Sequence, residues 1–289
     1  MHPLAGRSAI KMNGLGNAIV ILDLRDSTYE LDVPAVRAIA QAPELCFDQL
    51  MVLHAPVSPG TEAYVRIFNR DGSEAGACGN GTRCVAWVLL RDDEDRDQLK
   101  VETLNGILEC RRQGERRFSV EMGQPKFGWQ TIPLAEPIAD TAAIPFPIGR
   151  GGVALPAAAV NMGNPHAIFF VDDLDAYDLT LLGPRLEHDP LFPERANISF
   201  ARVLDRDHIA VSVWERGAGL TYACGSAACA VLVAAARRGL TGRNAVISLP
   251  GGDLSVNWRE SDGQVVLGGP VEWEFETILE SPLFEEETA

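Results

Sequence analysis

The chain carries an internal repeat, and this feature restricts its possible folds more than any other. The motif Ala77-Cys-Gly79 follows a strand-like run that ends at Asn69, and an apolar run comes after it. The motif Ala223-Cys-Gly225 repeats this arrangement behind a strand-like run that ends at Glu215. The two cysteines lie about 146 residues apart. A long fixed period of this kind indicates that one structural unit occurs twice.

Two further pairs of segments keep nearly the same spacing. Gly16-Asn17 and Gly163-Asn164 both precede apolar stretches, and residues 103–106 match residues 248–251 as short turns that end in glycine. Three matched blocks follow one another in the same order in both halves. We therefore interpret the chain as a duplicated domain whose copies are related by a pseudo-two-fold axis.

A proline-rich stretch between the copies marks the expected crossover, because proline removes a backbone donor and interrupts regular structure. Its prolines are Pro125, Pro133, Pro137, Pro145, Pro147 and Pro156. We expect an N-terminal domain over residues 1–124, joined by residues 268–289, and a C-terminal domain over residues 125–267. Two domains also suit a chain of 289 residues. Residues 285–289 are expected to form a frayed acidic tail.

Strand patterns outnumber helix patterns along the chain. They cover residues 19–24, 49–54, 64–68, 101–104, 118–122, 168–171, 209–214 and 246–249, and residues 265–275 also look strand-like. Residues 33–41 predict a helix capped by Asp32. The apolar runs after Cys78 and Cys224 predict two longer helices that are apolar on nearly all sides, as core helices are. We expect an α+β fold of two pseudo-symmetric domains, each a curved, mainly antiparallel sheet wrapped around a central helix.

Composition excludes several classes of partner. The net charge of −15 argues against nucleic acid, whose binding needs clustered Lys and Arg. No apolar stretch approaches the length of a membrane span, and no secretion signal is recognised at the N-terminus. The six cysteines are then expected to be reduced thiols of a cytoplasmic protein.

Cys78 and Cys224 each stand directly before a predicted helix and a glycine. The amides of a first helical turn lack partners and carry partial positive charge, which stabilises a thiolate or a bound carboxylate. A stereocentre placed between two such thiols can lose its proton to one sulfur and gain a proton from the other, which inverts it. The spacing of the cysteines offers no metal-binding pattern, so no metal is expected.

At these residues the sequence resembles the diaminopimelate epimerase family, over roughly residues 10–273. The motifs that carry the resemblance are Lys11-Met-Asn-Gly-Leu-Gly-Asn17, Phe68-Asn-Arg-Asp-Gly-Ser-Glu74, Ala77-Cys-Gly-Asn-Gly81, Asn161-Met-Gly-Asn-Pro-His166, Trp214-Glu-Arg-Gly217, Ala223-Cys-Gly-Ser226 and Leu249-Pro-Gly-Gly-Asp253. The resemblance implies interconversion of LL- and meso-diaminopimelate, a diamino dicarboxylic acid, in lysine and peptidoglycan precursor synthesis. It also implies a homodimer that needs neither pyridoxal phosphate nor metal.

The resemblance assigns roles residue by residue. Cys78 and Cys224 are implied to be the acid and base, which His166 and Glu215 assist. The amides of Gly79, Asn80, Gly225 and Ser226 are implied to hold the reacting carboxylate. The implied binders of the rest of the substrate are Asn17, Gln49, Asn69, Asn164, Asn197, Glu215 and Arg216.

Three positions depart from the family pattern. Ala18-Ile19 stands where Asp-Phe is usual, Leu220 where Glu is usual, and Asn13 where some members have His. The alternatives are a pyridoxal-phosphate-independent racemase or epimerase of another amino acid, a thiol redox sensor, and a paralogue that only binds its ligand. The last is motivated by Leu220.

Overall fold

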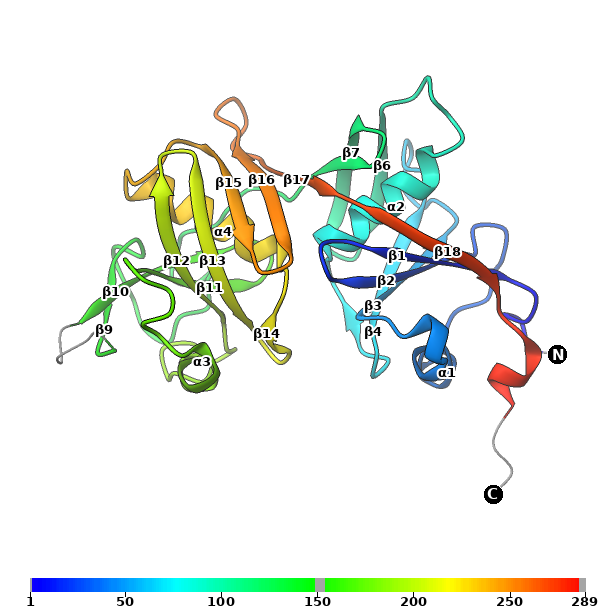
Figure 1. The fold of residues 1–289 in the computed structure, drawn as a ribbon, viewed down its shortest axis with the longest axis horizontal. Coiled ribbons are helices and arrows are strands. Elements are labelled where there is room, and N and C mark those ends of the chain that lie inside the picture. The colour runs from blue at the N-terminus through cyan, green and yellow to red at the C-terminus, as the bar shows by residue number, and fades with distance from the viewer. Residues whose placement is uncertain (1, 149–153, 286–289) are drawn as a thin grey trace. The chain divides into compact units, whose positions relative to one another are not determined.

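The computed structural model describes residues 2–148 and 154–285, which form two compact units (Figure 1). Unit 1 contains the described residues up to Val120 together with those from Gly269 onward. Unit 2 contains Glu121–Gly268. Of the expected acidic tail, residues 286–289 lie outside the described part of the chain.

Unit 1 is a mixed sheet with a helix packed against it. Its strands are β1 (Ser8–Asn13), β2 (Ala18–Asp23), β3 (Gln49–His54), β4 (Tyr64–Asn69), β5 (Glu74–Ala75), β6 (Gln98–Thr103), β7 (Gly106–Gly114), β8 (Arg117–Glu121) and β18 (Glu272–Ile278). They pair in the order β18-β1-β2-β3-β4-β6-β7-β8, and β5 forms a hairpin with β4. Among these pairs, β2–β3 and β4–β6 are parallel. Helix α2 (Gly79–Leu90) packs on β2, β3 and β7.

Unit 2 is built in the same way. Its strands are β9 (Ile144–Phe146), β10 (Leu155–Asn161), β11 (Pro165–Phe170), β12 (Asn197–Asp205), β13 (His208–Glu215), β14 (Gly219–Thr221), β15 (Asn244–Leu249), β16 (Gly252–Trp258) and β17 (Val265–Pro270). They pair in the order β9-β10-β11-β12-β13-β15-β16-β17, with β14 as a hairpin on β13. Among these pairs, β11–β12 and β13–β15 are parallel. Helix α4 (Gly225–Arg237) packs on β10, β11, β12, β13, β15 and β16.

The two units therefore repeat one topology strand by strand, including the position of both parallel pairs and of the short hairpin. The repeat extends to single hydrogen bonds in the turns before β2 and β11. The amide of Gly16 donates to the Asn13 side chain (2.7 Å), and the amide of Gly163 donates to the Asn161 side chain (2.7 Å). Both glycines have φ in the left-handed region, at 80° and 97°. The α+β class and the duplication are confirmed.

Helices α2 and α4 begin where the sequence predicts, with Cys78 and Cys224 as their N-cap residues. Helix α4 is buried along nearly its whole length, and its many alanines allow strands to approach it closely. Helix α1 (Val33–Gln41) also matches its prediction, because the Asp32 carboxylate accepts the Ala35 amide at 2.9 Å. Short 3-10 turns at Pro43–Leu45 and Ser281–Phe284 complete unit 1.

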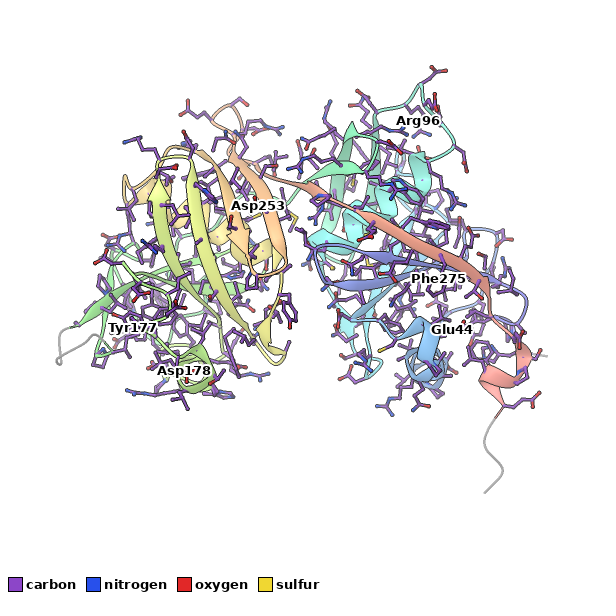
Figure 2. The ribbon with its side chains drawn as sticks, viewed as in Figure 1. Glu44, Arg96, Tyr177, Asp178, Asp253 and Phe275 are labelled. Atoms are coloured by element: carbon purple, nitrogen blue, oxygen red, sulfur yellow. The ribbon has the colours of Figure 1, made fainter. Side chains whose placement is uncertain are left out.

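Helix α3 (Leu179–Glu187) was not predicted. Pro184 lies inside it and Gly183 precedes that proline, and this pair normally indicates a loop. The helix starts at the N-cap Asp178, whose carboxylate accepts the Thr180 amide at 2.9 Å (Figure 2). Its buried face joins the core of unit 2, and tertiary packing rather than local propensity stabilises it.

Candidate active site

In unit 1, Cys78 occupies the turn that starts α2. Its backbone is extended (φ −147°, ψ 102°), and its sulfur accepts the Gly81 amide at 3.2 Å. The thiol also donates to Oε1 of Gln49 at 3.6 Å. Gly81 also lets α2 lie close to β3, because a Cβ there would lie 2.5 Å from the sulfur of Met51 on that strand. The sulfur is partly exposed and faces amide groups.

The other predicted residues of unit 1 gather around this turn. Gln49 on β3 pairs with Asn69 on β4, so their side chains share one face of the sheet. The turn before β2, which carries Asn17, lies against α2, since a Cβ on Gly14 would fall 3.1 Å from the Cβ of Asn80. The structure thus brings the unit 1 residues of the predicted site into one cluster.

Two features of this cluster bear on ligand binding. The side-chain oxygen of Asn17 is buried and has no hydrogen-bond partner among the described residues. The side chain of Asn80 is held by Arg83, whose Nη2 donates to its Oδ1 at 2.9 Å. Arg83 is fully buried one turn into α2 and therefore brings positive charge to the start of this helix.

In unit 2, Cys224 repeats the backbone role of Cys78 in a different environment. It is the N-cap of α4 (φ −126°, ψ 109°), is only 4% exposed, and its sulfur lies 3.5 Å from Oγ of Ser226. Burial raises the pKa of the Cys224 thiol well above its usual range, and the negative charge of Glu215 raises this pKa further. The Ser226 hydroxyl and the Ala227 amide act in the opposite direction.

Glu215 and Arg216 stand at the end of β13, in a turn held by its neighbours. The Glu215 carboxylate accepts the hydroxyl of Thr221 on β14 at 2.6 Å. The Arg216 amide donates to Oδ1 of Asn197 at 2.9 Å, and its guanidinium donates to the Glu194 carbonyl at 3.0 Å. The Asn197 side chain also donates to the Pro165 carbonyl at 3.1 Å, so it ties β12 to the start of β11.

His166 lies on β11 beside Asn197, its parallel partner on β12. It is fully buried, and its Nε2 lies 2.8 Å from Oδ1 of Asn164. Burial, and then the charge of Arg216, lowers the pKa of His166 to about 3. The imidazole is therefore neutral near pH 7, and its buried Nδ1 has no hydrogen-bond partner among the described residues.

Equivalent positions in the two units hold different chemistry. Gln49 and Asn197 both start a strand parallel to the one before it, and Asn69 and Glu215 both end the next strand. Unit 1 has neutral amides at both positions, whereas unit 2 has an amide and a carboxylate.

Several residues that support these clusters were missed by sequence analysis. Gly14 lies within a quoted motif and Arg83 lies two residues beyond one, but neither carries a signal of its own, because only packing shows their role. Thr221 has no motif. Glu187 lies in the unpredicted helix α3, where its carboxylate accepts the indole of Trp214 at 2.8 Å.

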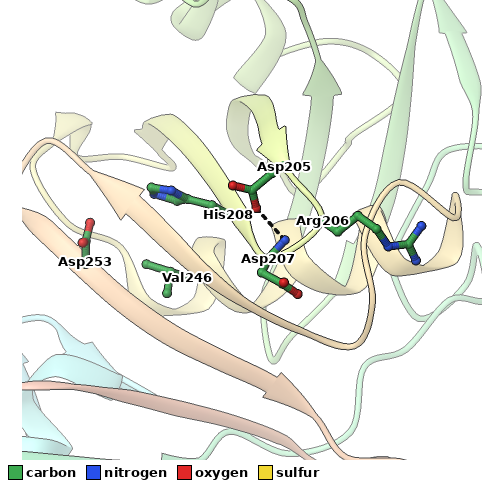
Figure 3. A pocket seen from close by; sticks show the side chains of 6 residues that line it. All are labelled: Asp205, Arg206, Asp207, His208, Val246 and Asp253. Carbon is green, nitrogen blue, oxygen red and sulfur yellow. Dashed lines mark hydrogen bonds between the residues drawn. The ribbon is translucent and has the colours of Figure 1, made fainter.

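A further surface pocket of unit 2 contains none of the predicted site residues. It is lined by Asp205, Arg206, Asp207, His208, Val246 and Asp253 (Figure 3). Nε2 of His208 lies 2.7 Å from Oγ of Ser248, which donates to Asp253 at 2.5 Å. The Ser248 hydroxyl thus gives its proton to a hydrogen bond with a carboxylate and not to the imidazole, so this arrangement does not make the serine a nucleophile.

Within residues 2–148 and 154–285, no three His, Cys, Asp or Glu side chains cluster as a metal ion requires. In the same part of the chain, no helix is long and apolar enough to cross a membrane.

The fold is similar to those of solved racemase and epimerase structures. A probable proline racemase from Agrobacterium radiobacter K84 superimposes with a TM-score of 0.70 at 11% identity, covering 97% of this chain and 94% of that chain. At the level of sequence, the chain matches the sequence model of the diaminopimelate epimerase family over residues 9–128 and 158–274.

Two relatives named diaminopimelate epimerase match along nearly their whole length. That of Methylocella silvestris is 57% identical over 291 residues and covers 100% of both chains. That of Methylobacterium sp. strain 4-46 is 54% identical over 290 residues, or 98% of this chain and 99% of the relative. The chain belongs to the diaminopimelate epimerase family and is an isomerase, as the motifs predicted.

Proposed function

We propose that the protein interconverts LL- and meso-diaminopimelate by a two-base mechanism, with Cys78 and Cys224 as acid and base. The observation that supports this most is the repeated cap: in each unit a cysteine begins a helix packed against the sheet. Each cap combines a proton-transfer group with backbone amides that suit a carboxylate.

The reaction breaks the Cα–H bond of the substrate. The thiolate of one cysteine takes the proton and forms an S–H bond, while the electron pair spreads into the substrate carboxylate. The second thiol then gives its proton to the opposite face of the carbon. In reverse the two sulfurs exchange roles.

The difficulty is the weak acidity of the Cα–H bond, because each pKa unit of mismatch with the base costs about 1.4 kcal/mol. The amides of Gly79, Asn80, Gly225 and Ser226 would stabilise the developing charge on the carboxylate. Preorganised donors of this kind usually make the largest contribution to such catalysis.

The contrast between the two thiols suggests their resting states. Cys224 is buried beside Glu215 and therefore rests as the neutral thiol, the proton donor. Cys78 donates to Gln49 and accepts the Gly81 amide, and the second of these bonds would stabilise a thiolate formed when the proton leaves. For the reverse direction, Glu215 and the neutral imidazole of His166 would assist removal of the Cys224 proton.

The remote end of the substrate carries an ammonium and a carboxylate. Arg216 would bind the carboxylate and Glu215 the ammonium, because the two are adjacent and have opposite charge. The amides of Asn17, Gln49, Asn69, Asn164 and Asn197 would complete recognition. The side-chain oxygen of Asn17 is buried and has no hydrogen-bond partner in the described part of the chain, which supports its place in this set.

Compartment, pathway and assembly are included in the proposal. The thiol pair must stay reduced, which a cytoplasmic location provides. We place the protein in the cytoplasm, as a homodimer, in the synthesis of lysine and peptidoglycan precursors.

Exchange of the substrate α-hydrogen with D2O tests the mechanism. The wild type should incorporate deuterium into diaminopimelate as it inverts, and Cys78→Ala and Cys224→Ala should each abolish epimerisation. Cys46→Ala is the matched control, since Cys46 is exposed and lies outside the cluster, and it should retain full activity. Full activity in either of the first two variants would contradict the two-base mechanism.

Substrate choice is tested separately. Assays with LL-diaminopimelate and with free L-amino acids should give turnover only with the former. Turnover of another amino acid alone would instead favour a racemase of that amino acid, and binding without turnover would favour a paralogue that only binds.

A further inference from the structure

Glu187, the last residue of α3, presents a buried carboxylate to the end of β13. It is 3% exposed. Its Oε2 accepts the indole Nε1 of Trp214 at 2.8 Å, and its Oε1 accepts the Gly217 amide at 3.0 Å and Nη1 of Arg195 at 3.2 Å. A buried carboxylate is costly unless it is satisfied in this way, and hydrogen bonds to a charged acceptor are the stronger kind.

The donors on Trp214 and Gly217 come from the residues on either side of Glu215 and Arg216. Glu215 and Arg216 are the ionisable pair proposed to recognise the remote end of the substrate. Trp214 comes directly before Glu215, and Gly217 comes directly after Arg216. Gly217 has φ 78°, a conformation that strains other residues, so the chain turns sharply there. One carboxylate therefore fixes both ends of this short segment.

Close packing adds to this constraint. A Cβ on Gly183 of α3 would lie 2.4 Å from the ring of Trp214, so the helix backbone rests directly on the indole. Helix α3 thus packs directly on Trp214 of β13, and Glu187 lies one turn further along the helix. Because this packing is close, the carboxylate has a defined position relative to the turn.

We infer that Glu187 is a positioning residue for substrate recognition, which holds the segment Trp214–Gly217 so that Glu215 and Arg216 meet the remote ammonium and carboxylate. This inference rests on the proposed function. The ion pair with Arg195 is the minor part, because Arg195 is 49% exposed and such pairs contribute little. The bonds to Trp214 and Gly217 carry the effect.

The first test separates KM from kcat. Glu187→Gln keeps the shape but cannot accept from both sides, so its amide NH2 must face either the indole N–H or the Gly217 amide. We expect KM for LL-diaminopimelate to rise about tenfold or more. We expect kcat to fall by a smaller factor, when it is expressed per active site whose cysteines react with an alkylating agent. Arg195→Gln, the matched control, removes only the ion pair and should leave KM within about twofold.

A merely structural role predicts a different pattern. Loss of folded protein lowers the active fraction and leaves KM unchanged, because KM does not depend on enzyme concentration. An unchanged KM in Glu187→Gln would therefore overturn the inference. Trp214→Phe combined with Glu187→Gln should recover part of the lost affinity, because it removes the donor that opposes the glutamine amide.

A second measurement needs no substrate and separates this inference from the proposed function. In amide and indole NMR spectra, Glu187→Gln should shift the indole resonance of Trp214 and the backbone amides of Glu215 and Arg216, while β15 and β16 keep their resonances. Unmoved amides in that turn would overturn the positioning role. An inactive wild type would overturn the proposed function, and the NMR comparison would still decide the positioning role.

Discussion

Single residues show how two copies of one design differ in charge. Cys78 and Cys224 have the same backbone role, but one is partly exposed among amides and the other is buried beside a carboxylate. Glu215 stands where the other copy has Asn69, and it brings negative charge to Cys224. The buried Arg83 has the opposite effect in unit 1, where it adds positive charge at the start of α2. The proposed two-base reaction, which needs one thiolate and one thiol, would benefit from this asymmetry.

His166 should govern part of the stability in acid. Its pKa is lowered to about 3 in the folded protein, whereas an unfolded histidine titrates near 6.5. The unfolded chain therefore binds more protons between these values, and stability falls as pH drops below about 6.5. The expected loss from this residue is about 2 kcal/mol at pH 5 relative to pH 8.

Urea unfolding of the wild type and of His166→Asn at a series of pH values measures this effect. The variant should lose stability less steeply between pH 6.5 and 5 than the wild type, whatever its stability at pH 8. Parallel curves would show that the imidazole is not held neutral in the folded protein.

The helices and strands show what local patterns predict and what they cannot. Helix α1 and strand β3 lie at the predicted residues. A cap residue defines the start of the helix, and an uninterrupted apolar run defines the strand. Strands β7 and β16 were missed, since their burial patterns are uneven. Strand β10 was missed although most of it is buried, because alanine and proline are weak strand formers.

The same limit applies to the site. Its cysteine caps follow from short motifs, and the residues predicted in unit 1 lie together around Cys78. Glu187 and Thr221 depend on how α3 and β14 pack on β13, which no local pattern reveals.

Close contact between α3 and β13 gives a prediction at the level of elements. Gly183→Ala should destabilise unit 2 by about 1–3 kcal/mol, because the new methyl group meets the rigid ring of Trp214 rather than a movable side-chain end. Gly242→Ala is the matched control, since nothing lies within 4 Å of a Cβ at that glycine. Urea unfolding of both variants measures the difference, and equal stabilities would mean that the indole gives way.

At the scale of the whole molecule, each unit has its own hydrophobic core. One core joins α1 to the sheet of unit 1 through residues such as Val36, Ile39 and Leu50. The other joins α3 to the sheet of unit 2 through Leu186, Phe169 and Phe200. Separate cores predict that the units unfold as separate cooperative blocks.

Calorimetry of variants with a defect in one unit tests this. Asp32→Ala removes the cap of α1 and should lower only the transition of unit 1, by about 3–5 °C for a loss of about 1 kcal/mol. Gly183→Ala should lower only the other transition. A single transition that both substitutions move would show that the two units unfold together.

Strand β18 determines when the sheet of unit 1 can be completed during synthesis. It pairs with β1, and Ser8 lies opposite Ile278, so the first sheet is completed by residues that the ribosome adds long after it has added β1. Residues 121–268 have been made by then, and the second half acquires all its strands before the first half acquires its last one. A premature stop codon shortly before residue 272 would therefore damage the half that was translated first. It would also damage the sheet on which α2, the helix that Cys78 caps, is packed.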